Sequence, residues 1–264
     1  MNPVVAVAVS LVPFAVTHWG LAWPPLRQPL VARLGRLGFI VFFSVIAWLT
    51  FGFAVSTYAG HASEGPAGLA LGAHGAARAV LIASIALGSM LMIGAFGGYA
   101  SSPYAMAGRD VCEPRGLERV TRHPFFVGTA LLGAAHALLA TRLVGAVFMG
   151  GLAAIALIGL ALQDRKLAAL RGEPYVHYLA ASSTLPFAAI AAGRQRLVLS
   201  ELPYGAMLIG LSVAWLLRAV HGSLFAHGGA YLMAVVVIGP LVILVVELWR
   251  DRRAHRPAAT STVG

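Results

Sequence analysis

The chain is 264 residues long, with 59% hydrophobic residues, 11% charged residues and a net charge of +10. Because a soluble domain carries about 25% charged residues, this composition excludes a soluble enzyme, a disordered chain and a collagen-like chain. The apolar stretches are long and lack the period of two of a membrane β-barrel, so they predict an all-α, polytopic transmembrane helix bundle. The lipid bilayer is the expected partner. Basic residues in membrane proteins mainly fix topology, so no nucleic-acid partner is expected.

Seven windows without Asp, Glu, Lys or Arg approach the roughly 20 residues that a helix needs to cross a bilayer. They lie at about 3–23, 37–60, 79–99, 124–141, 143–163, 202–217 and 228–246. The first window is interpreted as a helix rather than a signal peptide, because it has no basic residues before it and no small-residue cleavage site after it.

The basic residues support this count of seven. Sixteen of the nineteen lie in connections on one side of the predicted bundle, and only Arg78, Arg142 and Arg218 lie on the other side. Since the more basic side is normally cytoplasmic, the pattern predicts an outside N-terminus and a cytoplasmic C-terminus.

Four histidines lie within or beside the apolar windows, where a polar side chain is costly unless it has a partner. With a rise of ~1.5 Å per residue, the topology places His18 and His123 near the cytoplasmic end and His136 and His221 nearer the outer face. Two pairs at matched depth favour a functional role. The alternative for each histidine is a simple hydrogen bond to a neighbouring helix.

The fourth window begins with a basic turn, Arg122-His123-Pro124. Proline suits the first turn of a helix, where its missing N–H costs nothing. His123 then lies near the N-cap, beside free backbone donors and the positive end of the helix dipole, and Arg122 adds a fixed charge. The turn is therefore a candidate anion pocket, with a positive-inside anchor as the alternative.

A second polar stretch follows the fifth window. Pro174 can open a short interfacial helix with Tyr175, Tyr178 and Leu179 on one face. Tyrosines at this depth usually belong to the aromatic belt at the membrane surface. Asp164 or Glu173 could pair with Arg122 or Arg119, or bind a ligand amine.

Four motifs in this order resemble the NnrU family of bacterial membrane proteins. They are THWGLAWPPLRQPLVARLG at 17–35, GLERVTRHPFFVGTALLGAAHALLA at 116–140, DRKLAALRGEPYVHYLAASSTLPF at 164–187 and AVHGSLF at 219–225. The resemblance covers about 1–227 and implies an NnrU-like transmembrane domain there, with 228–264 as an additional helix and basic tail. It also implies a bacterial inner membrane location and a link to nitrogen-oxide metabolism.

Two relatives of that family imply different chemistry. Plant 15-cis-zeta-carotene isomerase is similar and uses haem b held by histidines, which implies a haem here and a lipophilic substrate. Bis-histidine ligation needs two imidazoles at matched depth, so His136 and His221 are the preferred metal-ligating pair, with His18 and His123 in reserve. The single Cys112 leaves no c-type haem attachment site, so any haem would be non-covalent.

The second relative is isoprenylcysteine carboxyl methyltransferase, which binds S-adenosylmethionine at the cytoplasmic end. The residues that map onto that family's pattern are Arg122, His123, Glu173, Tyr175 and Tyr178. Since His18 and Asp164 lie at the same depth, the predicted cofactor-binding residues are His18, Arg122, His123, Asp164, Glu173 and Tyr178. The paired glutamates of that family are replaced by Asp164-Arg165, which weakens the case for a methyltransferase. A non-catalytic accessory role in a respiratory or denitrification complex is the third alternative.

Overall fold

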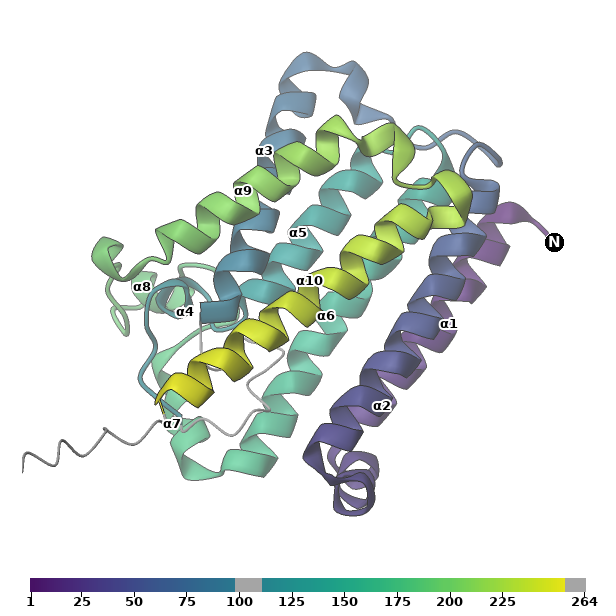
Figure 1. Cartoon of the computed structure of the whole chain (residues 1–264). Coiled ribbons are helices and arrows are strands. Elements are labelled where there is room, and N and C mark those ends of the chain that lie inside the picture. Colours follow the sequence, from purple (N-terminus) through teal and green to yellow (C-terminus); the bar gives the residue numbers. More distant parts are fainter. Residues whose placement is uncertain (98–110, 255–264) are drawn as a thin grey trace, which may run out of the picture.

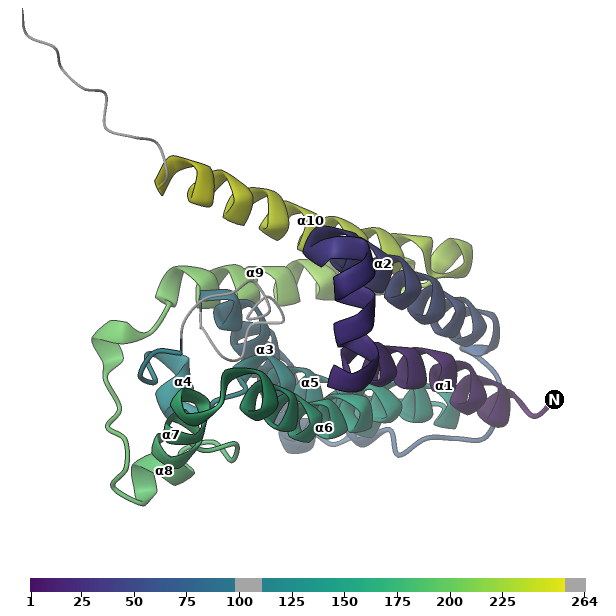
Figure 2. The same cartoon turned by 90° about the horizontal axis from the view of Figure 1, so that it is seen from below.

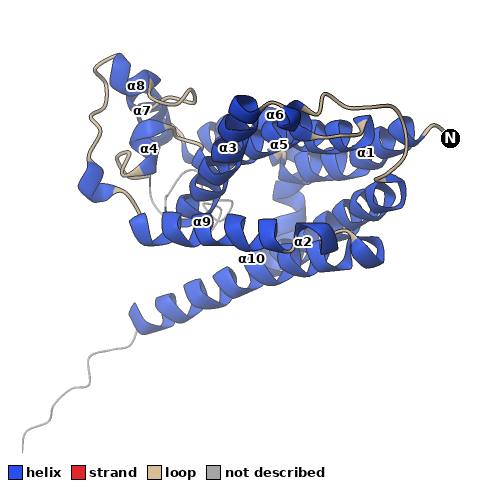
Figure 3. Cartoon of the chain, turned by 90° about the horizontal axis from the view of Figure 1, so that it is seen from above, coloured by secondary structure: helices blue, strands red, loops and turns tan. Residues whose placement is uncertain are grey.

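The computed structural model describes residues 1–97 and 111–254. Within these ranges every regular element is a helix, and the only strand-like pairing is a single bridge between Ala67 and Arg142 (Figure 3). The all-α class is therefore confirmed. The α-helices are α1 (Pro3–Ala22), α2 (Pro24–His61), α3 (Gly75–Gly94), α4 (Leu117–Val120), α5 (Pro124–Leu139), α6 (Leu143–Arg171), α7 (Glu173–Ala181), α8 (Ala188–Ala191), α9 (Tyr204–Ala219) and α10 (Ala226–Ala254). The 3-10 helices are η1 (Leu71–Ala73), η2 (Ala95–Gly97), η4 (Leu199–Glu201) and η5 (His221–Ser223).

Each predicted apolar window falls mainly within one α-helix. Residues 98 and 99 of the third window lie outside the described residues. Four helices, α1, α2, α3 and α6, are long and apolar enough to cross a membrane. Helices α5 and α9 and the 226–239 part of α10 are shorter apolar helices. At ~1.5 Å per residue, α5 and α9 reach only about 24 Å.

The helices form a continuous row of neighbours. Helix α9 packs on α3, α3 on α5, α5 on α6, α6 on α1, α1 on α2, and α2 on α10. The short helices α4, α7 and α8 lie at one end of the bundle and the N-terminus lies at the other end (Figure 1). Figure 2 shows α9 and α10 on one side of α5 and α6.

The best-defined core lies where α1, α2 and α6 meet. Its buried members are Val7, Leu11, Ala54, Val55, Val144 and Phe148. The outer faces are also apolar: Leu49, Val80 and Trp215, on three different helices, are 65%, 65% and 73% exposed. Apolar side chains that face outwards on several helices fit a lipid surface rather than water.

Helix α2 is divided by Gly35, whose φ of 69° and ψ of 170° are not helical. The short segment 24–34 therefore leaves the axis of 36–61, and in Figure 1 it is seen nearly end-on below the end of α1. The bend brings the basic residue Arg27 of the short segment back against Phe39 of the long one, 5.2 Å from the ring centre.

Two glycines allow α3 and α5 to approach closely. A Cβ on Gly128 of α5 would lie 2.5 Å from the carbonyl oxygen of Gly88, and a Cβ on Gly88 would lie 2.7 Å from that of Gly128. Any side chain at either position would force the two backbones apart. This contact fixes α5 against α3 and so positions the polar turn with which α5 begins.

Candidate functional site

The basic turn before α5 is held by backbone contacts with a distant loop. The hydroxyl of Thr121 donates to the carbonyl of Thr184 at 2.7 Å, and the N–H of Arg122 donates to the carbonyl of Ser183 at 2.8 Å. His123 is the N-cap residue and Pro124 begins α5, as the sequence predicts. The turn thus presents the Arg122 and His123 side chains towards α6.

The carboxylate of Asp164, near the end of α6, is the centre of the site. Its Oδ2 accepts from Nε and Nη2 of Arg122 at 3.0 and 2.8 Å. Its Oδ1 lies 2.7 Å from Nε2 of His123 and accepts from the hydroxyl of Tyr175 at 2.8 Å. One carboxylate therefore joins α6, the turn before α5, and α7.

Burial makes these bonds strong. His123 and Tyr175 have 0% exposure, and the Asp164 and Arg122 side chains are 15% and 16% exposed. Burial raises the pKa of both Tyr175 and Tyr178, and the negative charges of Asp164 and Glu118 respectively add to the rise. Both phenols therefore stay neutral and can act as hydrogen-bond donors at any physiological pH.

The predicted anion pocket exists, and the anion it holds is Asp164 of the chain itself. The pairing of Asp164 with Arg122 is confirmed, and Arg122 does not point into water as a simple anchor would. Because both Asp164 oxygens already accept two bonds each, the carboxylate has little capacity left for a ligand amine. A ligand amine would have to compete with Arg122, His123 and Tyr175 for this carboxylate.

Two predicted members of the cluster lie elsewhere. Glu173 is exposed, and its carboxylate is 3.9 Å from Nε2 of His177, a contact in open solvent. His18 makes its ring contacts with Phe14 and Phe43, at 5.0 and 4.9 Å between ring centres, rather than pairing with His123. Similar depth along the bundle did not bring His18 and His123 together, because α1 packs on α2 and α6 whereas α5 packs on α3 and α6.

The short helix α7 is confirmed, but its tyrosines are not part of an aromatic belt. Tyr175 and Tyr178 are 0% and 3% exposed, stack on each other at 5.5 Å and pack against Leu167 of α6. Gly172, with φ of 61°, ends α6 and turns the chain so that α7 folds back on it. Tyr175, which maps onto the methyltransferase pattern but is not in the predicted cofactor-binding set, is a direct partner of Asp164. Its signal was the Gly172–Pro174 turn between an apolar helix and a tyrosine pair.

Two buried polar atoms at this site lack hydrogen-bond partners among the described residues. They are Nδ1 of His123 and the hydroxyl of Tyr178. Tyr178 also lines a cavity of about 460 Å³ together with Val111, Cys112, Glu113, Pro174 and His177. The cavity is the place where a polar ligand could approach the cluster from the loop side.

A second ion pair braces the same end of the bundle. Arg119 of α4 binds both carboxylate oxygens of Glu201, with Nε–Oε2 and Nη2–Oε1 distances of 2.7 and 2.9 Å. Glu201 also accepts from the N–H of Gly116 at 3.0 Å. The hydrogen bonds from Arg119 and Gly116 lower the pKa of Glu201 from 4.5 to about 2. Arg119 therefore pairs with Glu201 and not with Glu173 or Asp164.

At the opposite end, His136 of α5 and His221 of η5 lie side by side. Their ring centres are 6.2 Å apart and their planes differ by 27°. Nδ1 of His136 lies 2.9 Å from the carbonyl oxygen of Leu132. Because that oxygen can only accept, Nδ1 carries the proton and Nε2 keeps its lone pair. Among the described residues no group of three or more His, Cys, Asp or Glu side chains could hold a metal ion, so no third such side chain joins this pair.

Comparisons with known proteins identify a family and two relatives. A family model described as NnrU protein matches residues 6–245. The match extends past residue 227 into α10, and the division of the chain at residue 227 stays a prediction. The 15-cis-zeta-carotene isomerase of Arabidopsis thaliana is 31% identical over 236 residues, 86% of this chain and 60% of that protein. The Zea mays enzyme of the same name is 33% identical over 112 residues, 42% of this chain and 30% of that protein.

The chain thus spans less than two thirds of the length of these curated relatives. Both are described as chloroplastic. No solved structure matches the chain. Since the family model covers nearly the whole sequence, the chain belongs to the NnrU family.

Proposed function

We propose that the chain is a membrane protein that binds haem b between His136 and His221 and isomerises a double bond of a lipophilic polyene. The observation that carries this proposal is the approach of these two imidazoles from elements 85 residues apart in sequence, α5 and η5. The similarity to zeta-carotene isomerases supports the substrate class.

His136 and His221 are the two residues that would hold the haem iron. Imidazole nitrogen is a common ligand of haem iron, and two such rings lie here with their centres 6.2 Å apart. The bond from His136 Nδ1 to Leu132 fixes the tautomer and orients the ring, as second-shell partners of ligating histidines do.

The chain's own groups supply binding, orientation and an apolar surrounding. Haem supplies, when bound, a metal centre with one-electron and Lewis-acid chemistry, which the protein side chains lack. His136 holds its proton at Nδ1 and presents Nε2 from an apolar helix, whereas His221 is exposed. His221 lies in the connection between α9 and α10, so its approach to His136 depends on where α9 ends and α10 begins.

Isomerisation is favoured over two of the other roles that the sequence left open. A cis–trans change conserves atoms and electrons and needs no redox partner, whereas reduction of a nitrogen oxide needs an electron donor. An accessory role gives no account of the proximity of His136 and His221.

The test is the absorption spectrum of the protein purified in detergent from haem-replete cells. We expect a Soret band, and we expect His136→Ala and His221→Ala each to lose most of it because one axial ligand is gone. His74→Ala removes an exposed histidine and is the matched control, which should keep its haem. A colourless wild-type protein, or haem retained in both ligand variants, would show that this pair does not bind haem. Conversion of 15-cis-zeta-carotene by the haem-loaded protein then tests the activity.

We further propose seven membrane crossings, an outside N-terminus and a cytoplasmic C-terminus in a bacterial inner membrane. The supporting observation is that Arg78, Arg142 and Arg218 lie at the start of α3, before α6 and at the end of α9, all at one end of the bundle. A reporter fused after Arg253 should behave as cytoplasmic, and one inserted within 61–76 as external. A periplasmic C-terminus would mean an even number of crossings and contradict the proposal.

A further inference from the structure

Three buried side-chain nitrogens near the junction of α1 and α2 have no hydrogen-bond partner within the described part of the chain. They are Nδ1 of His18, Nε1 of Trp19 and Nε of Arg27. The Trp19 and Arg27 nitrogens are donors, whereas the role of the His18 nitrogen depends on its tautomer. Because a buried donor without a partner is destabilising, and more so if it is charged, these atoms indicate an acceptor from outside the chain.

Two aromatic side chains of α2 contact the side chains of His18 and Arg27. The ring of His18 lies 4.9 Å from that of Phe43, and the guanidinium of Arg27 lies 5.2 Å from the ring centre of Phe39. Phe39 and Phe43 are successive neighbours on one face of α2, with ring centres 6.1 Å apart. His18 of α1 and Arg27 of the segment before the Gly35 bend therefore lie against the same face of α2. Together with Lys166 they form a surface that is called the cationic wall below.

The charges that act on this wall are positive. Lys166 of α6, which is only 6% exposed, repels a positive charge on His18. Arg36 repels the charge of Arg27 in the same way. Arg27 also repels the charge of Lys166. Cations that approach one another at a membrane surface repel, and an anion between them relieves that repulsion.

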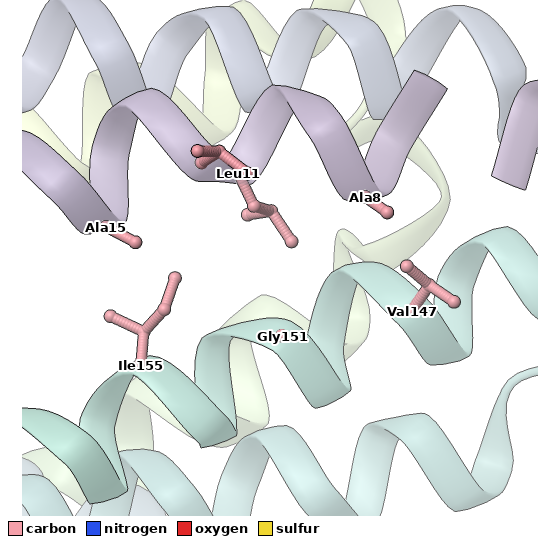
Figure 4. Close-up of a pocket in the computed structure, with 7 residues that line it drawn as sticks. Ala8, Leu11, Ala15, Val147, Gly151 and Ile155 are labelled. Carbon is pink, nitrogen blue, oxygen red and sulfur yellow. The ribbon is translucent and has the colours of Figure 1, made fainter. Parts of the chain in front are cut away.

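An apolar groove leads directly away from this cationic wall. It has a volume of about 200 Å³ and lies between α1 and α6 (Figure 4). Its lining residues are Ala8, Leu11, Val12 and Ala15 on α1 and Val147, Gly151 and Ile155 on α6.

Trp19 stands where the groove meets the wall. His18 and Trp19 are one turn beyond Ala15 on α1, and Gly159 is one turn beyond Ile155 on α6. Nε1 of Trp19 lies 3.7 Å from the position that a Cβ on Gly159 would take, so the indole spans the space between the two helices. One continuous surface therefore has a cationic end and a hydrocarbon end.

We propose that this surface binds an anionic phospholipid, with its phosphate among His18, Trp19 and Arg27 and an acyl chain in the α1–α6 groove. The charge complementarity selects an anionic headgroup over a zwitterionic one. The groove selects a lipid over a free anion. The site lies at the end of the bundle opposite to His136 and His221, so it stands whether or not that pair binds haem.

The test measures binding of phosphatidylglycerol and of phosphatidylcholine to the delipidated full-length protein by native mass spectrometry. We expect phosphatidylglycerol to bind at least tenfold more tightly. Arg27→Gln should weaken its binding roughly fivefold, since each basic residue near the headgroup contributes about 1 kcal/mol. Trp19→Phe keeps an aromatic side chain but removes the N–H donor together with part of the ring, and should weaken binding severalfold.

Arg33→Gln is the matched control, because it removes the same charge from an exposed position of the same 24–34 segment. It should leave binding unchanged. Equal loss in Arg27→Gln and Arg33→Gln would overturn the proposal in favour of diffuse attraction, and so would equal binding of the two lipids. Inorganic phosphate and glycerol phosphate are added in competition. If either displaces the lipid at equimolar concentration, the groove contributes nothing and the site is one for a free anion.

Discussion

Replacing Asp164 with alanine is expected to lower the free energy of unfolding by about 3 kcal/mol or more, because removal of one partner of a buried ion pair leaves the other charge uncompensated. Arg122, His123 and Tyr175 would all lose their shared acceptor. Asp164→Asn keeps the shape and one acceptor, and should fall between wild type and alanine. Unfolding in mixed SDS–detergent micelles, followed by tryptophan fluorescence, measures these changes.

The matched control is Glu173→Ala, which removes a carboxylate of 85% exposure from the next helix. It should change the free energy of unfolding by no more than about 0.5 kcal/mol. A double variant, Asp164→Ala with Arg122→Ala, should be less destabilised than the sum of the two single variants, because the second change removes the charge left unpaired by the first. Equal effects of Asp164→Ala and Glu173→Ala would show that the cluster does not hold α5, α6 and α7 together.

Gly128→Ala is expected to destabilise the bundle by about 2–3 kcal/mol, in the range measured for overpacked sites. The new Cβ would lie 2.5 Å from the carbonyl oxygen of Gly88 and 2.9 Å from the nitrogen of Met92, both backbone atoms that cannot rotate away. Helix α5 would then have to separate from α3. The same unfolding assay measures the loss.

Gly20→Ala makes the same chemical change in α1, at a position with no other atom within 4 Å of the new Cβ. Because alanine is the better helix former, this variant should be unchanged or more stable by up to about 1 kcal/mol. The two variants should thus differ in the sign of their effect. A Gly128→Ala protein as stable as wild type would mean that α3 and α5 are not in backbone contact.

The positions of the helices were predictable because hydrocarbon leaves the backbone no alternative to internal hydrogen bonds. Charge-free windows therefore became helices, and Pro124 marked the start of α5. Hydropathy does not report which helices are neighbours. The contact of α1 with α6 and that of α2 with α10 depend on side-chain fit, and the Gly35 bend in α2 had no clear signal.

The candidate site was predictable only in part. Shared depth and opposite charge correctly indicated Arg122 with Asp164. Among many arginines at one end, however, charge alone cannot select partners, and the pairing of Arg119 with Glu201 joins residues 82 positions apart. Tyr175 was interpreted as a surface residue because its depth suits an aromatic belt, whereas the turn at Gly172 buries it.

The short lengths of α5 and α9 have a consequence for the surrounding membrane. Two apolar helices of about 24 Å do not match a hydrocarbon core that is ~30 Å thick. A helix that is too short is accommodated by local thinning of the bilayer or by association with other proteins, at a cost that rises with each ångström of mismatch. The bilayer beside α9 should therefore be compressed, whereas α2 and α6 are long enough for the full thickness. Such a difference across one molecule gives the protein a preferred orientation towards its neighbours and a preference for thinner membranes.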